Sequence, residues 1–159
     1  MDEKTVKEKT GLSFGISIRI LNEDDLDSIL SIEDHLNISR ELCLPSSKEE
    51  IEKCLSSECS CGVVLNGEIV AYSLCYYTEY CTGYIEKCYV DSICRGHGFQ
   101  RTLIEYNIGN LVSHNVSDIY SMVSPLNQYS LDNFIKAGFV RRNSTMCEGH
   151  RRMILKFEL

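Results

Sequence analysis

The stretch from Val90 to Tyr106, which reads VDSICRGHGFQRTLIEY, constrains the fold more than any other part of the chain. A strand-like run, GYIEKCYV, leads into it from residue 83, and the apolar residues Phe99, Leu103 and Tyr106 then follow at helical spacing. Two glycines and an arginine therefore stand between a strand and a helix. A strand–turn–helix unit of this kind predicts that the chain packs helices against a sheet.

The rest of the chain continues this pattern. Alternating apolar residues predict a first strand over Phe14–Leu21, and two helices follow, the first capped within residues 22–25 and the second by Ser47 with Glu50 three residues later. The pair Asn66-Gly67 predicts the tight turn of a hairpin. Further strands are expected at 83–90, 119–123, 140–146 and 151–158, and further helices at 99–112 and 128–136. The expected order is β-α-α-β-β-β-α-β-α-β-β, a mixed α/β sheet in a single domain over residues 13–159, preceded by a flexible N-terminus over residues 1–12.

The glycine turn is suited to binding an anion. The first backbone N–H groups of a helix have no partner within the helix, and with the positive end of the helix dipole they attract a phosphate. Gly96 and Gly98 carry no Cβ that would keep a phosphate from the backbone, and Arg95 adds a positive charge. The turn therefore predicts a pyrophosphate site; the alternative is a plain turn whose glycines only permit tight packing. A Walker loop or a dinucleotide fingerprint does not fit, because no Gly-Lys-Ser/Thr follows and the turn comes past the middle of the chain.

Composition excludes several classes of protein. The net charge of −7 and the pI near 5.1 do not suit non-specific nucleic-acid binding, which needs a basic surface. No apolar run approaches the roughly 18 residues of a membrane span, and the charged N-terminus does not resemble a secretory signal. The nine cysteines are spaced irregularly, without the paired pattern of a metal site. We therefore expect a cytoplasmic protein with reduced thiols, no metal, no nucleic-acid partner and no membrane association.

A second motif follows at residues 123–139, VSPLNQYSLDNFIKAGF. A strand ends there, Asn127 precedes a short helix, and Gly138-Phe139 closes that helix. With both motifs in this order and at this spacing, the chain resembles the GCN5-related N-acetyltransferase (GNAT) family along nearly its full length, from Phe14 to Leu159. The resemblance implies the acyltransferase fold of that family, with acetyl-CoA as donor and co-substrate.

The resemblance also implies which residues bind acetyl-CoA. Backbone N–H groups of the turn would hold the pyrophosphate, main-chain groups of the preceding strand would pair with the pantetheine arm between two splayed strands, and Asn127 would bind the arm from the other side. The expected cofactor-binding residues are Cys88, Tyr89, Val90, Arg95, Gly96, His97, Gly98, Phe99, Gln100, Asn127 and Ser130. Gln100 stands where the family often has a small residue, so its side chain must point away from the phosphates.

The expected catalytic residues are Glu86 and Tyr129. Acetyl transfer to an amine needs a base, and Glu86 is the best-placed carboxylate, since strand alternation puts it on one face with Tyr84 and Cys88. The alternative is a solvated glutamate paired with a lysine. Phe134 stands where many family members carry a tyrosine that acts as general acid toward the CoA thiolate. Tyr129 is the expected substitute, unless it only packs or caps and the thiolate leaves without a protein acid. Four strand tyrosines are expected either to wall the acceptor pocket or simply to pack half-buried: Tyr72, Tyr76, Tyr77 and Tyr80.

Three functions fit these features. The first is an acetyl-CoA-dependent N-acetyltransferase that transfers the acetyl group directly to a primary amine of a small molecule or a protein. The second is a module of the same fold that binds or senses acyl-CoA without catalysis, which the missing hydroxyl at residue 134 keeps open. The third is a nucleotide-binding regulator. The sequence does not name the amine acceptor, and it leaves open whether the chain forms a homodimer.

Overall fold

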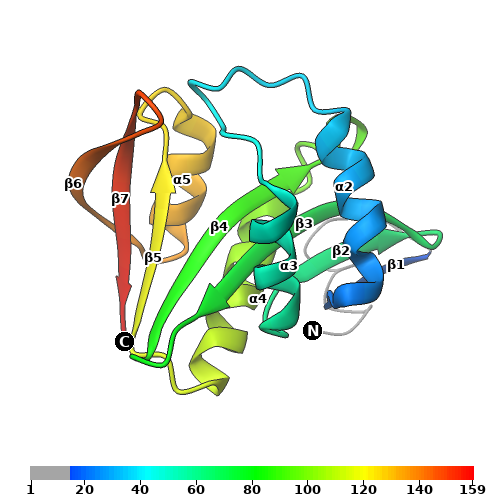
Figure 1. The fold of residues 1–159 in the computed structure, drawn as a ribbon, viewed down its shortest axis with the longest axis horizontal. Coiled ribbons are helices and arrows are strands. Elements are labelled where there is room, and N and C mark those ends of the chain that lie inside the picture. The colour runs from blue at the N-terminus through cyan, green and yellow to red at the C-terminus, as the bar shows by residue number, and fades with distance from the viewer. Residues whose placement is uncertain (1–14) are drawn as a thin grey trace.

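The computed structural model describes residues 15–159, in which seven strands form one mixed sheet of order β1-β2-β3-β4-β5-β7-β6 (Figure 1). The strands are β1 (Ile16–Ile20), β2 (Cys61–Leu65), β3 (Glu68–Tyr77), β4 (Thr82–Val90), β5 (Asp118–Val123), β6 (Val140–Cys147) and β7 (His150–Glu158). The helices are α2 (Leu26–Asp34), α3 (Lys48–Ser56), α4 (Phe99–Ser113) and α5 (Gln128–Lys136), with the short 3-10 turns η1 (Glu23–Asp25) and η2 (Ser92–Cys94). The predicted α/β class and element order are confirmed. The expected flexible segment 1–12 and the start of the first strand at Phe14 lie outside the described residues.

The helices start and stop where local side chains satisfy their end groups. Ser47 Oγ accepts from the Glu50 N–H at 3.2 Å, and Glu50 Oε2 accepts from the Ser47 N–H at 2.7 Å, which is the predicted capping box of α3. The first helix differs slightly from its prediction. Asn22 caps the turn η1, which then continues into α2, and its side chain accepts from the N–H of Asp24.

The helices cover both faces of the sheet. Tyr72 and Leu74 of β3 pack under α2 and α3, together with Ile29 and Ile51. The opposite face packs against α4 and α5 in two clusters, which include Leu103, Ile104, Leu131 and Phe134. No helix in residues 15–159 is long and apolar enough to cross a membrane.

The centre of the sheet is split. β4 and β5 run parallel and pair from Thr82 with Asp118 to Ile85 with Ser121, and no pairing follows. Beyond this point the two strands diverge (Figure 1). The strand edge of residues 86–90 that would face β5 therefore has no β5 partner, and the prediction of two splayed central strands is confirmed.

A β-bulge lies at the point of separation. Ile85 and Lys87 pair with consecutive residues of β3, so Glu86 is the extra residue. Glu86 is hydrogen-bonded to Tyr76 on the α2–α3 face, whereas Cys88 packs into the core beside α4 and α5. The expectation that Glu86 and Cys88 share a face is wrong, because the bulge shifts the period-two alternation of the strand.

Gly138 offers a test of how α5 ends. It has φ +105, and a Cβ built on it would lie 2.8 Å from the ring of Phe157. We expect Gly138→Ala to lower the free energy of unfolding by about 1–3 kcal/mol, since both the backbone angle and the ring contact resist a methyl group. Gly109→Ala is the matched control. Gly109 is exposed in α4, and an added Cβ would meet no atom within 4 Å. Gly109→Ala should therefore raise the free energy of unfolding by up to about 1 kcal/mol, because alanine favours the helix. Urea unfolding measures both, and equal stability of the two variants would contradict the packing described.

Candidate active site

A cleft of about 960 Å³ opens where β4 and β5 separate. Its walls come from β4, β5 and β7, from the segment between α2 and α3, and from the N-terminal ends of α4 and α5. Of the residues expected at the site, those that line the cleft are Glu86, Cys88, Tyr89, Val90, Arg95, Gly96, Gln100, Asn127, Tyr129 and Ser130. The remaining three, His97, Gly98 and Phe99, belong to the turn beside it. Residues 15–159 contain no group of three or more His, Cys, Asp or Glu side chains that could hold a metal ion.

The glycine turn has the geometry of an anion cradle. Gly96 and Gly98 have φ +83 and +77, in the left-handed region that favours glycine, and Gly98 is the N-cap of α4. A Cβ built on either glycine would meet no atom within 4 Å. Close packing is therefore not what requires these glycines. The open space lies at the positive end of a long helix, where a phosphate fits, so the residues present suit the pyrophosphate of acetyl-CoA.

Gln100 joins the two helix ends that border the cleft. Its Nε2 donates to Ser130 Oγ at 3.0 Å, and its Oε1 accepts from Asn133 Nδ2 at 2.8 Å. The buried side chain thus turns toward α5 and away from the glycine turn, as the resemblance requires. Ser130 lines the cleft and its hydroxyl also accepts a hydrogen bond from Gln100.

Two groups stand on opposite sides of the opening. Asn127 is the N-cap of α5, and its Oδ1 accepts from the N–H of Ser130 at 3.2 Å. That bond leaves the amide nitrogen of Asn127 to donate to a ligand. The same cleft is lined by the edge of β4 that β5 no longer pairs. Arg95 lies at the end of this edge, where its Nε donates to the carbonyl of Val90 at 3.3 Å.

Glu86 lies in a setting that favours a base. The Glu86 side chain is exposed to the cleft, and partial desolvation by the cleft walls raises the pKa of its carboxyl group above the ordinary value. The negative charge of Glu50 also raises this pKa, whereas the hydrogen bond from Tyr76 and the charge of Lys53 lower it. The Tyr76 ring stacks on that of Tyr84 with centroids 5.0 Å apart, and Lys53 Nζ lies 3.5 Å from the Tyr76 centroid. A carboxylate with a raised pKa is a stronger proton acceptor than a solvated one.

The tyrosines are arranged only in part as expected. Tyr129 lines the cleft with 56% of its surface exposed. Phe134 is buried and its ring packs edge-on against that of Phe139. Because this residue is a phenylalanine, it offers no hydroxyl to the cleft. Of the two expectations for Tyr72, Tyr76, Tyr77 and Tyr80, the wall of an acceptor pocket is not found, because none of them lines the cleft, and packing in or on the sheet remains. Tyr72 is fully buried and Tyr80 is 80% exposed. The tyrosines that do line the cleft besides Tyr129 are Tyr84, Tyr89 and Tyr120.

Sequence reasoning also missed two parts of the cleft wall. Residues 37–39 and 42–46 lie between α2 and α3 and line it, as does the buried Arg152 on β7. The long segment without helical or strand periodicity was the available signal, because long irregular loops in compact domains are usually functional. The position of Arg152 had no comparable signal.

Comparison with known proteins agrees with this geometry. The model of the acetyltransferase (GNAT) family matches residues 29–139. A comparison with curated protein sequences gave no match. The fold is similar to a chain of the NatC complex bound to Gag peptide and CoA, with 21% identity, a TM-score of 0.77, and coverage of 92% of this chain and 99% of that chain.

Two further solved structures show the same fold. Arabidopsis thaliana Naa50, in complex with the bisubstrate analogue CoA-Ac-MVNAL, has 16% identity and a TM-score of 0.76, with coverage of 91% of this chain and 99% of that chain. The ribosomal-protein-S18-alanine N-acetyltransferase from Escherichia coli has 18% identity and a TM-score of 0.71, with coverage of 90% and 93%. The family model spans most of the chain, and the split sheet, the glycine turn and the cleft agree with it. This chain therefore belongs to the GNAT family of acetyltransferases, which use acetyl-CoA.

Proposed function

We propose that this protein transfers an acetyl group from acetyl-CoA directly to a primary amine, of a small molecule or of a protein. The observation that carries the proposal is one cleft that joins a glycine turn open to a phosphate, an unpaired strand edge and a carboxylate with a raised pKa. Acetyl-CoA supplies the acetyl group as a thioester, which an amine attacks with formation of a C–N bond and loss of the CoA thiolate.

Each part of the cleft has a role in this proposal. The N–H groups of residues 96–100 and the edge of β4 hold and orient the donor, and Asn127 donates to it from α5. Glu86 accepts a proton from the attacking amine, directly or through water. Tyr129 donates a proton to the leaving sulfur from the first turn of α5. Much of the rate comes from positioning the two reactants together.

Peptide amines are the first acceptors to test. Two of the similar structures carry peptide components, the Gag peptide and the CoA-Ac-MVNAL analogue. A suitable panel contains the pentapeptide Met-Val-Asn-Ala-Leu, spermidine and free amino acids, with release of CoA as readout.

A non-catalytic acyl-CoA-binding module is the second candidate. The observation that favours it is Phe134, a buried ring where the family often places an acidic hydroxyl. The two candidates differ in one measurement. An acetyltransferase binds acetyl-CoA and releases CoA with an amine of the panel, whereas a sensor binds acetyl-CoA and leaves it intact with every amine.

Gly98→Val tests the donor site. We expect it to weaken acetyl-CoA binding at least about tenfold, because its side chain would fill the space in which a phosphate approaches the backbone. Gly67→Val in the β2–β3 turn is the matched control. It also has positive φ and open space at the Cβ, so its folding cost should be similar while calorimetric affinity for acetyl-CoA stays unchanged. Wild-type affinity in Gly98→Val would place the phosphates elsewhere.

Tyr129→Phe tests the proton donor. Deleting the hydroxyl should slow single-turnover acetyl transfer by about 10²–10⁴ with little change in packing, since the ring is more than half exposed. Tyr80→Phe, in the exposed β3–β4 turn, controls for loss of a tyrosine hydroxyl far from the cleft. A Tyr129→Phe enzyme within twofold of wild type at every pH would leave solvent to protonate the thiolate.

Glu86 sets the acid limb of the pH profile. Its raised pKa means that the base is protonated, and activity lost, at a higher pH than for an ordinary glutamate. Tyr76→Phe removes a hydrogen bond that stabilises the ionised form, so the acid limb of kcat/KM should move to still higher pH. Glu86→Gln should abolish this limb and lower kcat/KM by about 10²–10⁴. An acid limb unchanged in both variants would assign the base to another group.

A further inference from the structure

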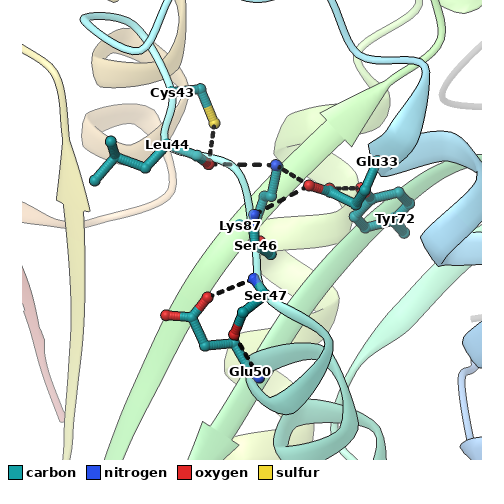
Figure 2. Close-up of polar contacts among 8 residues, drawn as sticks. All are labelled: Glu33, Cys43, Leu44, Ser46, Ser47, Glu50, Tyr72 and Lys87. Carbon is teal, nitrogen blue, oxygen red and sulfur yellow. Dashed lines mark hydrogen bonds and ion pairs between the residues drawn. The ribbon is translucent and has the colours of Figure 1, made fainter.

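Lys87 and Glu33 form a buried ion pair that the proposed chemistry does not use. Lys87 Nζ and Glu33 Oε2 lie 2.7 Å apart, and each side chain is only 5% exposed (Figure 2). Taking two charges out of water costs several kcal/mol per ion before their attraction offsets it, so an apolar pair of similar volume would stabilise the core as well. Stability alone therefore does not explain the pair.

The pair holds the chain segment between α2 and α3. The N–H of Ser46 donates to Glu33 Oε2 at 3.1 Å, and Lys87 Nζ donates to the carbonyl of Leu44 at 3.4 Å (Figure 2). The hydroxyl of Tyr72 donates to the other oxygen of the Glu33 carboxylate. We call Glu33, Tyr72 and Lys87 the β4 anchor and residues 35–47 the acceptor loop. The charges of the anchor are thus satisfied in part by the backbone of the loop.

A second buried cation holds the same loop from β7. Arg152 is 4% exposed, and its guanidinium donates to the carbonyls of Arg40 at 2.6 Å and Glu41 at 2.8 Å. The side chain of Arg40 pairs in turn with Glu148, in the turn between β6 and β7. The loop therefore spans from the β4 side of the split sheet to the β7 side and back, as the arch above the strands shows (Figure 1).

The loop walls the side of the cleft opposite to the donor site. The β4 anchor lies on the α2–α3 face, with Tyr72 in the core there, whereas Phe99 and Leu103 place the glycine turn and α4 on the other face. Residues 37–39 and 42–46 of the loop line the cleft. The loop connects α2 to α3, so it covers the same face of the sheet as the β4 anchor. Fixing a loop of this length costs conformational entropy, which the two cations offset by binding its carbonyls.

We infer that Lys87 and Arg152 are positioning residues for the amine acceptor: from opposite sides of the cleft they hold the acceptor loop as the wall against which the acceptor lies beside Glu86. The bulge of β4 brings Glu86 and Lys87 to one face, so one carboxylate meets the reacting amine while the next residue fixes the loop. The inference rests on the proposed function, because it assumes an amine acceptor.

Two variants release the loop from either side. Arg152→Met removes the bonds to residues 40 and 41. The double variant Glu33→Gln/Lys87→Met removes the charges of the β4 anchor without leaving one of them buried and unpaired, which alone would be strongly destabilising. Arg142→Met is the matched control, because Arg142 forms an exposed ion pair with Glu158 on the β6–β7 hairpin. Circular dichroism verifies folding, and Arg152→Gln, which removes the charge but stays polar, replaces Arg152→Met if the latter does not fold.

Amide hydrogen exchange of residues 37–46 in the free protein reads the loop directly. We expect exchange there to be at least about tenfold faster in both test variants, with wild-type exchange in α4 and throughout Arg142→Met. Trypsin cleavage after Arg40 should also accelerate in Arg152→Met, since the carbonyl of that residue is no longer held there. Unchanged loop exchange in the test variants overturns the anchoring. This readout needs no acceptor, so it decides even where the proposed function fails.

Kinetics then test the acceptor role. With Met-Val-Asn-Ala-Leu, or otherwise the panel amine acetylated fastest, the acceptor KM should rise at least about tenfold in both test variants, and kcat should fall less. The calorimetric Kd for acetyl-CoA should stay within twofold of wild type. A loosened loop with an unchanged acceptor KM, or with an equal loss of acetyl-CoA affinity, overturns the inference. Wild-type protein that binds acetyl-CoA but releases no CoA with any amine instead refutes the proposed function.

Discussion

Beyond Ile85 and Ser121 the parallel pairing of β4 with β5 stops, and the backbone groups of β4 that would have met β5 face a cleft. Unpaired backbone groups inside a protein need partners, so the split creates a place for an extended ligand that can act as an added strand. The glycine turn, the caps of α4 and α5 and the loop between α2 and α3 all border this split. Because the sheet is open there, residues from all of these segments line a single cleft.

The bulge at Glu86 sets how the charged groups are distributed around the opening. It turns Glu86 and Lys87 toward the same face, one into the cleft and one onto Glu33. A regular strand would have sent one of the two into the apolar core beside α4. The buried cations Lys87 and Arg152 then bind loop carbonyls on either side of the cleft, which gives a long irregular segment a defined place.

The cleft is lined by two kinds of polar residue, one buried and hydrogen-bonded and the other exposed to solvent. Gln100 is buried and hydrogen-bonded between α4 and α5, so it fixes the donor end of the cleft rigidly. Glu86 and Tyr129 also line the cleft, and both keep contact with solvent. In the proposed acyl transfer, the fixed residues would position the donor and the solvated ones would exchange protons.

The sequence alone determined the caps and turns, which depend on residues next to one another along the chain. The capping box at Ser47, the turn at Asn66-Gly67, the glycine turn before α4 and the stop at Gly138 each follow from local backbone preferences, and all are found in the structure. Tertiary structure decided the rest. The bulge, the burial of Tyr72, the pairing of Lys87 with Glu33 and the hold of Arg152 on the acceptor loop join residues far apart in sequence. No local pattern encodes such contacts, because they depend on strand register and on packing between elements that meet only in the folded chain.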